Sequence, residues 1–225
     1  MPDDQTSPSD SDSDSEPGID TARVIRKRPK PGERRVQILQ ALASMLEQPG
    51  AERITTAALA ARLDVSEAAL YRHFASKAQM FEGLIEFIEQ TVFTLVNQIG
   101  ERELAGVEPD AATGGRHAGK VVAMVLQFAD KNPGMTRVMV GDALVFENER
   151  LQQRMNQFFD KIEAALRQGL RSSADAGGSA APTVDSQLVA SALTAFVVGR
   201  LHRYARSGFK RSPTENLEAS LALIL

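Results

Sequence analysis

The chain has 225 residues, of which 43% are hydrophobic and 24% are charged, and it contains no cysteine. This length suits one or two globular domains, and the lack of cysteine excludes both a disulfide framework and a thiolate metal site. The longest apolar run, LVASALTAFVVG at 188–199, is too short to cross a bilayer, and the acidic N-terminus lacks a signal-peptide pattern. We therefore expect a cytoplasmic protein without a membrane span.

The formal net charge of −3 hides a sharp change of charge near the N-terminus. Residues 1–20 contain seven acidic residues and no Lys or Arg, whereas residues 21–40 contain seven basic residues and one acid, Glu33. A Ser/Asp/Pro-rich stretch with so few apolar residues cannot bury enough surface to offset chain entropy, so a disordered tail is predicted over 1–31. The basic half of this tail suits contact with the phosphates of a polyanion. The alternative is a solvated tail in which the acidic residues screen the basic ones.

Two helices are predicted directly after this tail. The first starts at Gly32 and has apolar residues at three- and four-residue steps along one face, namely Val36, Leu39, Leu42, Ala43 and Leu46. The segment EQPG at 47–50 ends this helix. Thr55 is a good N-cap for a short second helix, ITTAALAARL, which stops at Asp64.

A third helix follows at once. Ser66 is its expected N-cap, and Val65 and Leu70 have the spacing of a hydrophobic staple. Leu70 and Phe74 form the stripe expected to be buried. Two short helices joined by a tight turn predict a helix-turn-helix.

The side chains off this stripe suit contact with DNA. Small Ala68 permits close approach to base edges, Tyr71 reaches bases or backbone, and Glu67 has the acceptor for a cytosine amino group. Arg72, His73 and Lys77, with the hydroxyls that cap the second helix, suit phosphate oxygens. The full predicted DNA-binding set is Thr55, Thr56, Ser66, Glu67, Ala68, Ala69, Tyr71, Arg72, His73 and Lys77. On periodicity alone, an amphipathic helix in a generic bundle is an equal alternative.

The string ITTAALAARLDVSEAALYRHFASKAQMFEGLIEFIE resembles the DNA-binding head of the TetR family, whose third helix typically ends in LYRHF and a lysine. Asp64 stands where the family's turn usually has glycine, and Ala75 replaces a common proline. The resemblance implies an all-α, homodimeric protein that reads palindromic double-stranded DNA with two recognition helices about one duplex turn apart.

Within that family, the second half of the chain is similar to the nucleoid occlusion factors, through NPGMTRVMVGDALVFENERLQQRMNQFFDKIEAALRQ and RSGFKRSPT. This branch binds the C-terminal tail of FtsZ, the tubulin-like division GTPase, when on DNA, and so inhibits division-septum assembly over the nucleoid. The resemblance implies a groove for that tail between the helix beginning at Lys77 and the helix ending in KNPG. The matching positions are Phe87, Met124, Phe128, Lys131 and Asn132. The alternative is that Phe87 and Phe128 are ordinary core residues.

Further helices are predicted over 77–100, 121–131, 135–171, 185–207 and 214–225, with loops at 105–119 and 172–183, and no strand is expected. The resulting organisation is a tail (1–31), a helix-turn-helix domain (32–78) and a C-terminal helical domain for dimerisation and partner binding (79–225). In the TetR family the last two helices pair with those of a partner. The small residues Ala192, Ala195 and Gly199 resemble that dimer interface, with packing inside one chain as the alternative.

Catalysis finds no support in the sequence. In GGRHAGK at 114–120 the spacing of Gly114, Gly119 and Lys120 matches a phosphate-binding loop, but Val121 replaces the Ser or Thr that binds magnesium, and no buried strand precedes it. The three histidines lie far apart without partners at ligand spacing, so neither a metal nor a cofactor is expected. The rival functions are a ligand-responsive repressor of the same family and a helical adaptor that does not bind DNA.

Overall fold

The computed structural model describes residues 32–48, 54–104, 112–176 and 182–225, and the predicted tail at 1–31 lies outside these ranges. Every regular element in the described ranges is helical, which confirms the all-α class. The elements in chain order are α1 (Glu33–Leu46), α2 (Thr56–Arg62), α3 (Glu67–Tyr71), α4 (Lys77–Leu104), α5 (Thr113–Lys131), α6 (Pro133–Met139), the 3-10 turn η2 (Asp142–Leu144), α7 (Glu149–Ala176), α8 (Pro182–Arg206) and α9 (Leu217–Leu221).

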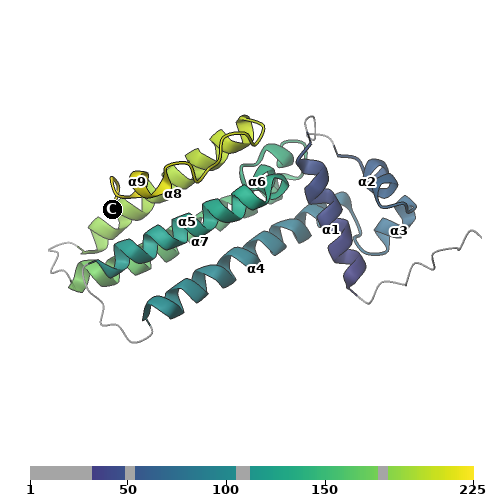
Figure 1. Ribbon diagram of the computed structural model, residues 1–225. Coiled ribbons are helices and arrows are strands. Elements are labelled where there is room, and N and C mark those ends of the chain that lie inside the picture. Colours follow the sequence, from purple (N-terminus) through teal and green to yellow (C-terminus); the bar gives the residue numbers. More distant parts are fainter. Residues whose placement is uncertain (1–31, 49–53, 105–111, 177–181) are drawn as a thin grey trace, which may run out of the picture.

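The short helices α1, α2 and α3 form a head at one end of the molecule, and the long helices form an extended body (Figure 1). Within the body α5 packs against α4, α7 and α8, while α7 and α8 lie side by side. One apolar core runs without a break from Ile38 in α1 to Leu201 in α8, and α4 contributes to it throughout the length of the body. The boundary at residue 78 stays a prediction, because α4 takes part in both the head and the body.

The first helix buries a slightly different face from the one predicted. Val36 was expected in the core but is 50% exposed, whereas Ile38, Leu42 and Leu46 are at most 1% exposed. These three residues follow a strict four-residue step, so the buried stripe starts two residues later than the sequence pattern indicated.

The predicted loop over 105–119 is wrong for its second half, since α5 begins at Thr113. The segment GGRHAG at 114–119 therefore lies within a helix and does not form a turn. A Cβ on Gly169 of α7 would lie 2.6 Å from the ring of His117, so this α5 side chain fits against α7 only because glycine stands there. Because residues 113–119 are helical, they do not form the loop that binds phosphate.

The single helix predicted over 135–171 is divided in two. Gly141 adopts a left-handed backbone with φ 84°, which ends α6 and leads into η2. A new helix, α7, then begins after Asn148, whose side chain accepts a hydrogen bond from the Arg150 backbone N–H at 2.9 Å. It extends to Ala176, past the predicted start of a loop at 172.

The C-terminal segment is less helical than predicted, because α9 comprises only Leu217–Leu221 of the expected 214–225. Arg200 of α8 is 8% exposed and donates to the carbonyl oxygens of Pro213 at 3.3 Å and Glu215 at 2.5 Å. It also donates to the Ser220 hydroxyl at 2.7 Å. Desolvation by burial lowers the pKa of this guanidinium, and the positive charge of Arg203 lowers it further. Arg200 therefore holds the segment before α9 in a non-helical course.

Candidate DNA and partner interfaces

The turn between α2 and α3 is a Schellman motif. The backbone N–H of Val65 donates to the carbonyl of Ala60, and that of Asp64 donates to the carbonyl of Ala61, each at 3.1 Å. Asp64 has φ 54°, a left-handed conformation that Asp tolerates better than most residues other than glycine. This turn sets the angle between the two helices of the helix-turn-helix.

Both helices of the motif begin with the predicted caps. The Thr55 hydroxyl accepts from the Ala58 N–H at 3.1 Å, and the Ser66 hydroxyl accepts from the Ala69 N–H at 3.3 Å. The two N-termini are also joined, since Thr56 Oγ1 donates to Glu67 Oε2 at 2.5 Å. These hydroxyls and the Glu67 carboxylate thus already have partners within the protein, and contact with DNA must extend or replace them.

The third helix presents the predicted face to solvent. Leu70 and Phe74 are at most 1% exposed and anchor α3 on the core, while Tyr71 is 46% exposed. Glu67, Ala68, Arg72 and His73 are exposed as well, and Ala69 is half-buried. The structure therefore leaves the predicted DNA-binding residues from Glu67 to His73 exposed, apart from half-buried Ala69.

Arg35 of α1 positions this surface, although the sequence indicated only that it belongs to a basic stretch. Its Nη1 donates to the carbonyl oxygen of His73 at 2.9 Å, and its guanidinium lies 4.1 Å from the centroid of the Phe74 ring. It thus holds the C-terminal end of α3 against α1. The contact joins residues 38 positions apart in the chain, so no local pattern reveals it.

Lys77, predicted to contact phosphate, lies at the first position of α4. Its ammonium group forms an ion pair with Glu147 at 2.5 Å, and its side chain is 32% exposed. Ser76 caps this helix, since its hydroxyl accepts from the Gln79 N–H at 3.1 Å, and Gln79 Oε1 accepts from the N–H of Ala75, one residue before the cap, at 2.8 Å. In this structure Lys77 therefore connects the head to the loop before α7.

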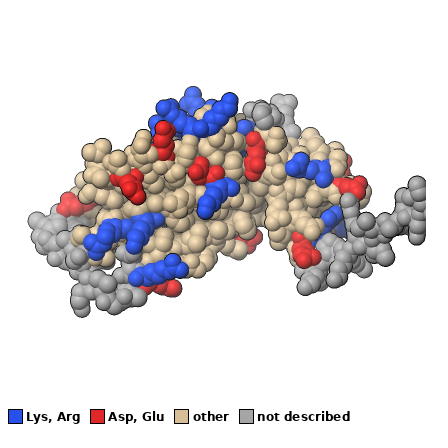
Figure 2. Space-filling model, in the orientation of Figure 1, with Lys and Arg blue, Asp and Glu red and all other residues tan. Residues whose placement is uncertain are grey.

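On the face of the molecule that Figure 2 shows, charge does not by itself mark a DNA-binding side. Figure 2 shows Lys and Arg mixed with Asp and Glu over much of this face, with a dense group of Lys and Arg at the top of the view. The end of α8 and the segment after it carry the exposed bases Arg203, Arg206, Lys210 and Arg211. The assignment of the head therefore depends on the geometry of α3 rather than on a basic patch.

The residues predicted for the FtsZ tail lie on the packed helices α4 and α5 and at the turn into α6. Phe87 is 44% exposed on α4, Met124 is half-buried on α5, and Lys131 is exposed at the end of α5. Phe128 is only 9% exposed, so its ring belongs to the core and offers little surface to a peptide. Asn132 is half-buried, and its Nδ2 donates to the Phe128 carbonyl at 2.6 Å.

The predicted dimer strip on α8 faces solvent in the single chain. Ala192, Ala195 and Gly199 are all exposed, and the strip continues into Val184 and Leu188, which are 58% and 66% exposed. Packing inside one chain is thus the wrong reading for these residues. By length and composition α8 also meets the criterion for a membrane span, as core helices of soluble proteins can, and 33% of the relevant window is buried.

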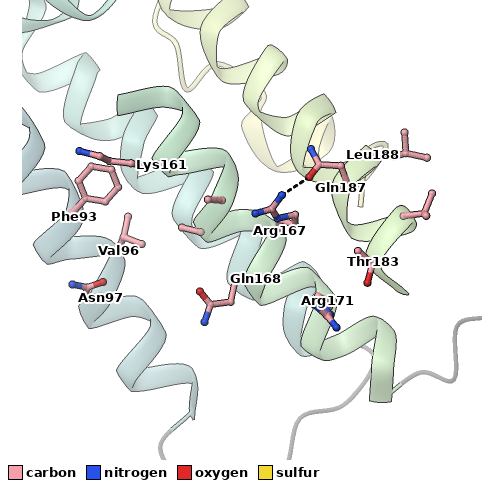
Figure 3. Close-up of a pocket in the computed structure, with 13 residues that line it drawn as sticks. Phe93, Val96, Asn97, Lys161, Arg167, Gln168, Arg171, Thr183, Gln187 and Leu188 are labelled. Carbon is pink, nitrogen blue, oxygen red and sulfur yellow. Dashed lines mark hydrogen bonds between the residues drawn. The ribbon is translucent and has the colours of Figure 1, made fainter. Parts of the chain in front are cut away.

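An open cavity of about 1040 Å³ lies between α4, α7 and α8, with Phe93, Val96 and Leu188 among its apolar walls (Figure 3). Its basic side chains are Lys161, Arg167 and Arg171, and Arg167 donates to Gln187 at 2.9 Å. The described residues contain no group of three His, Cys, Asp or Glu side chains placed to hold a metal ion.

Two family models match the chain: "Bacterial regulatory proteins, tetR family" over residues 38–84 and "Tetracyclin repressor-like, C-terminal domain" over 116–225. The Nucleoid occlusion factor SlmA of Vibrio vulnificus is 50% identical over 196 residues, which cover 87% of this chain and 95% of the relative. That of Photobacterium profundum is 51% identical over 186 residues, covering 82% and 90%. The chain belongs to the nucleoid occlusion factor family. These relatives are named as occlusion factors and not as enzymes, and the matching heads are those of TetR-type regulators.

Solved structures agree with this family in fold. A TetR-like transcriptional regulator from Rhodococcus has a TM-score of 0.65 at 20% identity and covers 88% of this chain and 97% of its own. The regulator FadR from Bacillus subtilis, solved with stearoyl-CoA, has a TM-score of 0.62 at 13% identity and covers 84% and 96%. At these identities the likeness concerns the fold, and the family membership comes from the nucleoid occlusion relatives.

Proposed function

We propose that this member of the nucleoid occlusion factor family binds palindromic chromosomal DNA as a homodimer and, when bound, captures the C-terminal tail of FtsZ. Capture of FtsZ inhibits assembly of the division septum over the nucleoid, and it requires a protein located in the cytoplasm on the DNA. The observation that carries the proposal is 50% identity over 196 residues, which cover 87% of the chain and so include both the head and the body. Similarity of the head alone would fit any regulator of this type.

The DNA half of the proposal is supported by the outward face of α3. Ala68 leaves room for the helix to approach base edges, and Tyr71 and Arg72 flank it on the exposed side. Two such helices related by a two-fold axis fit two half-sites of a palindrome. The exposed strip on α8 is the surface that we assign to the second subunit.

The part of the proposal that concerns FtsZ is supported by fewer residues. Phe87 supplies an exposed aromatic anchor, and Lys131 supplies a positive charge for an acidic peptide. Phe128 is assigned a supporting role beneath the surface, because its ring is buried while its carbonyl holds Asn132.

The experiment that tests the proposal is capture of FtsZ by the immobilised protein with and without chromosomal fragments, followed by sequencing of the retained DNA. We expect capture to depend on DNA and the retained fragments to share a palindrome. Lys131→Glu should reduce capture of FtsZ while leaving DNA retention intact, and Ala68→Glu should abolish specific retention. Release from DNA by a small molecule, without FtsZ capture, would instead support the ligand-responsive repressor, for which the cavity between α4, α7 and α8 offers space.

A further inference from the structure

The head and the body meet backbone to backbone at Gly134. A Cβ built on this α6 residue would lie 1.9 Å from the carbonyl oxygen of Ala43 in α1 and 2.8 Å from its carbonyl carbon. It would also lie 3.3 Å from Cγ of Glu47. The oxygen belongs to the main chain of a helix, so it cannot rotate away as a side chain would. Any residue larger than glycine must therefore separate α6 from α1.

On the head side, α1 is fixed to the DNA-reading helix. Arg35 binds the His73 carbonyl and stacks on Phe74, and Ala43 lies eight residues further along the same helix. Eight residues are slightly more than two turns of an α-helix, which moves as a rigid element over that length. A shift of α3 as it seats in a DNA groove is thus carried along α1 to Ala43.

On the body side, the start of α6 is fixed to the last turn of α5. The Thr136 hydroxyl is fully buried and donates to the carbonyls of Ala129 at 2.9 Å and Asn132 at 3.1 Å. Asn132 closes the same turn through its backbone N–H to Ala129 at 3.1 Å and its side chain to Phe128 at 2.6 Å. This turn carries Lys131, so the position of α6 sets the position of the basic end of the FtsZ groove.

The geometry points to Gly134 as the positioning residue that couples DNA occupancy to affinity for the FtsZ tail. The inference rests on the proposed function and adds its route: α3, Arg35, α1, the Gly134–Ala43 contact, α6 and the end of α5. A contact between two main chains transmits small displacements because neither side can absorb them by a rotamer change. Coupling between two binding sites typically amounts to about 5- to 150-fold in affinity, and it must be equal in both directions.

The test measures the affinity of the full-length dimer for an FtsZ C-terminal peptide, alone and with saturating DNA from the capture experiment. In wild type we expect DNA to increase the affinity for the peptide by about 5- to 150-fold, and the peptide to increase the affinity for DNA by the same factor. Gly134→Ala should bring both factors close to one, while the folded variant still binds DNA. Gly115→Ala is the matched control, because a Cβ there meets nothing within 4 Å, and it should keep the wild-type factors.

The outcomes separate this inference from the proposed function. If wild type shows no DNA-dependent peptide binding, the proposed function fails. If wild type shows it and folded Gly134→Ala retains the full factor, the proposed function stands and the coupling route is wrong. Should Gly134→Ala not fold, Arg35→Ala tests the same route from the head side at saturating DNA: a reduced factor supports the route, and an unchanged one overturns it.

Discussion

The guanidinium of Arg35 lies over the ring of Phe74, 4.1 Å from its centroid, while the same group donates to the neighbouring His73 carbonyl. Phe74 in turn lies over Gly83 of α4, where a Cβ would come within 3.2 Å of the ring. The first and third helices of the head and the first turns of α4 are therefore joined at one aromatic side chain. Its position depends on contacts from parts of the chain that are distant in sequence.

Arg35→Ala should lower the free energy of unfolding by about 1–2 kcal/mol, from loss of one charged hydrogen bond and one cation–π contact at a partly exposed site. DNA affinity should fall as well, because α3 loses its support. The measurements are urea unfolding and DNA binding at several salt concentrations. Arg34→Ala is the control, since Arg34 lies next to Arg35 on α1 and donates to its helical neighbour Gln37 at 2.9 Å. A loss of DNA affinity with unchanged stability would assign Arg35 to phosphate instead.

The ion pair between Lys77 and Glu147 leads to a second prediction, which concerns the affinity for DNA. If Lys77 contacts phosphate, as its place beside α3 favours, the Glu147 carboxylate competes with DNA for it. Glu147→Gln should therefore tighten DNA binding by roughly two- to fivefold at low salt, and Lys77→Ala should weaken it at every sequence. Equal affinities in both variants, with lowered thermal stability, would mean that the pair serves only to join head and body.

Much of the head could be predicted because its rules are local. The caps at Thr55 and Ser66 and the left-handed turn at Asp64 each involve residues within five positions of one another. The buried pair Leu70 and Phe74 follows from the helical repeat. The exposed face of α3 is what remains once that pair is placed, so the candidate DNA-binding residues were within reach of sequence reasoning.

The predictions that proved wrong concern segments whose structure depends on residues far away in the sequence. The residues of α5 before Val121 have the composition of a loop but are helical, and His117 among them packs beside Gly100 of α4 and Gly169 of α7. The segment before α9 has helical periodicity and is held open by Arg200. Phe128 was predicted to line the groove for the FtsZ tail, but its side chain is buried. Helical periodicity shows which residues share a face of α5, and it does not show which face another helix covers.

Tyr204 provides a prediction about pH. Its hydroxyl donates to the Asp130 carbonyl oxygen at 3.1 Å, and burial raises its pKa above the ordinary 10.0, helped by the negative charges of Asp130 and Glu47. Because the pKa is higher in the folded state, the protonated phenol stabilises the fold below pH 10.0, and this stability is lost as pH rises through the folded pKa.

The chain has two tyrosines and no tryptophan, so Tyr71→Phe leaves Tyr204 as the single source of tyrosinate absorbance. We expect its titration midpoint above 10.0, and unfolding by urea should return it to the ordinary value. Tyr204→Phe should lower the free energy of unfolding by about 1 kcal/mol near neutral pH, and less above the midpoint. A folded midpoint at or below the ordinary value would show that the phenol is not held as described.

The last prediction concerns dimer formation through the exposed strip on α8. Leu188 is 66% exposed and continues the run of Ala192, Ala195 and Gly199, whose small side chains allow another helix to approach closely. Ala195→Glu places a charge at the centre of that run, where a second subunit would bury it without a partner, so the dimer dissociation constant should rise roughly 100-fold or more. Ala112→Glu, at an exposed position directly before α5 and outside the last two helices, is the control and should leave the dimer intact.

Sedimentation measures the oligomeric state, and DNA binding supplies an independent reading. A monomer can occupy only one half-site at a time, so Ala195→Glu should lose the gain in affinity that a palindrome offers over a single half-site. Binding to the half-site alone should stay unchanged, because α3 lies in the head and α8 in the body. A variant that remains dimeric and still prefers the palindrome would place the subunit interface on another face of the body.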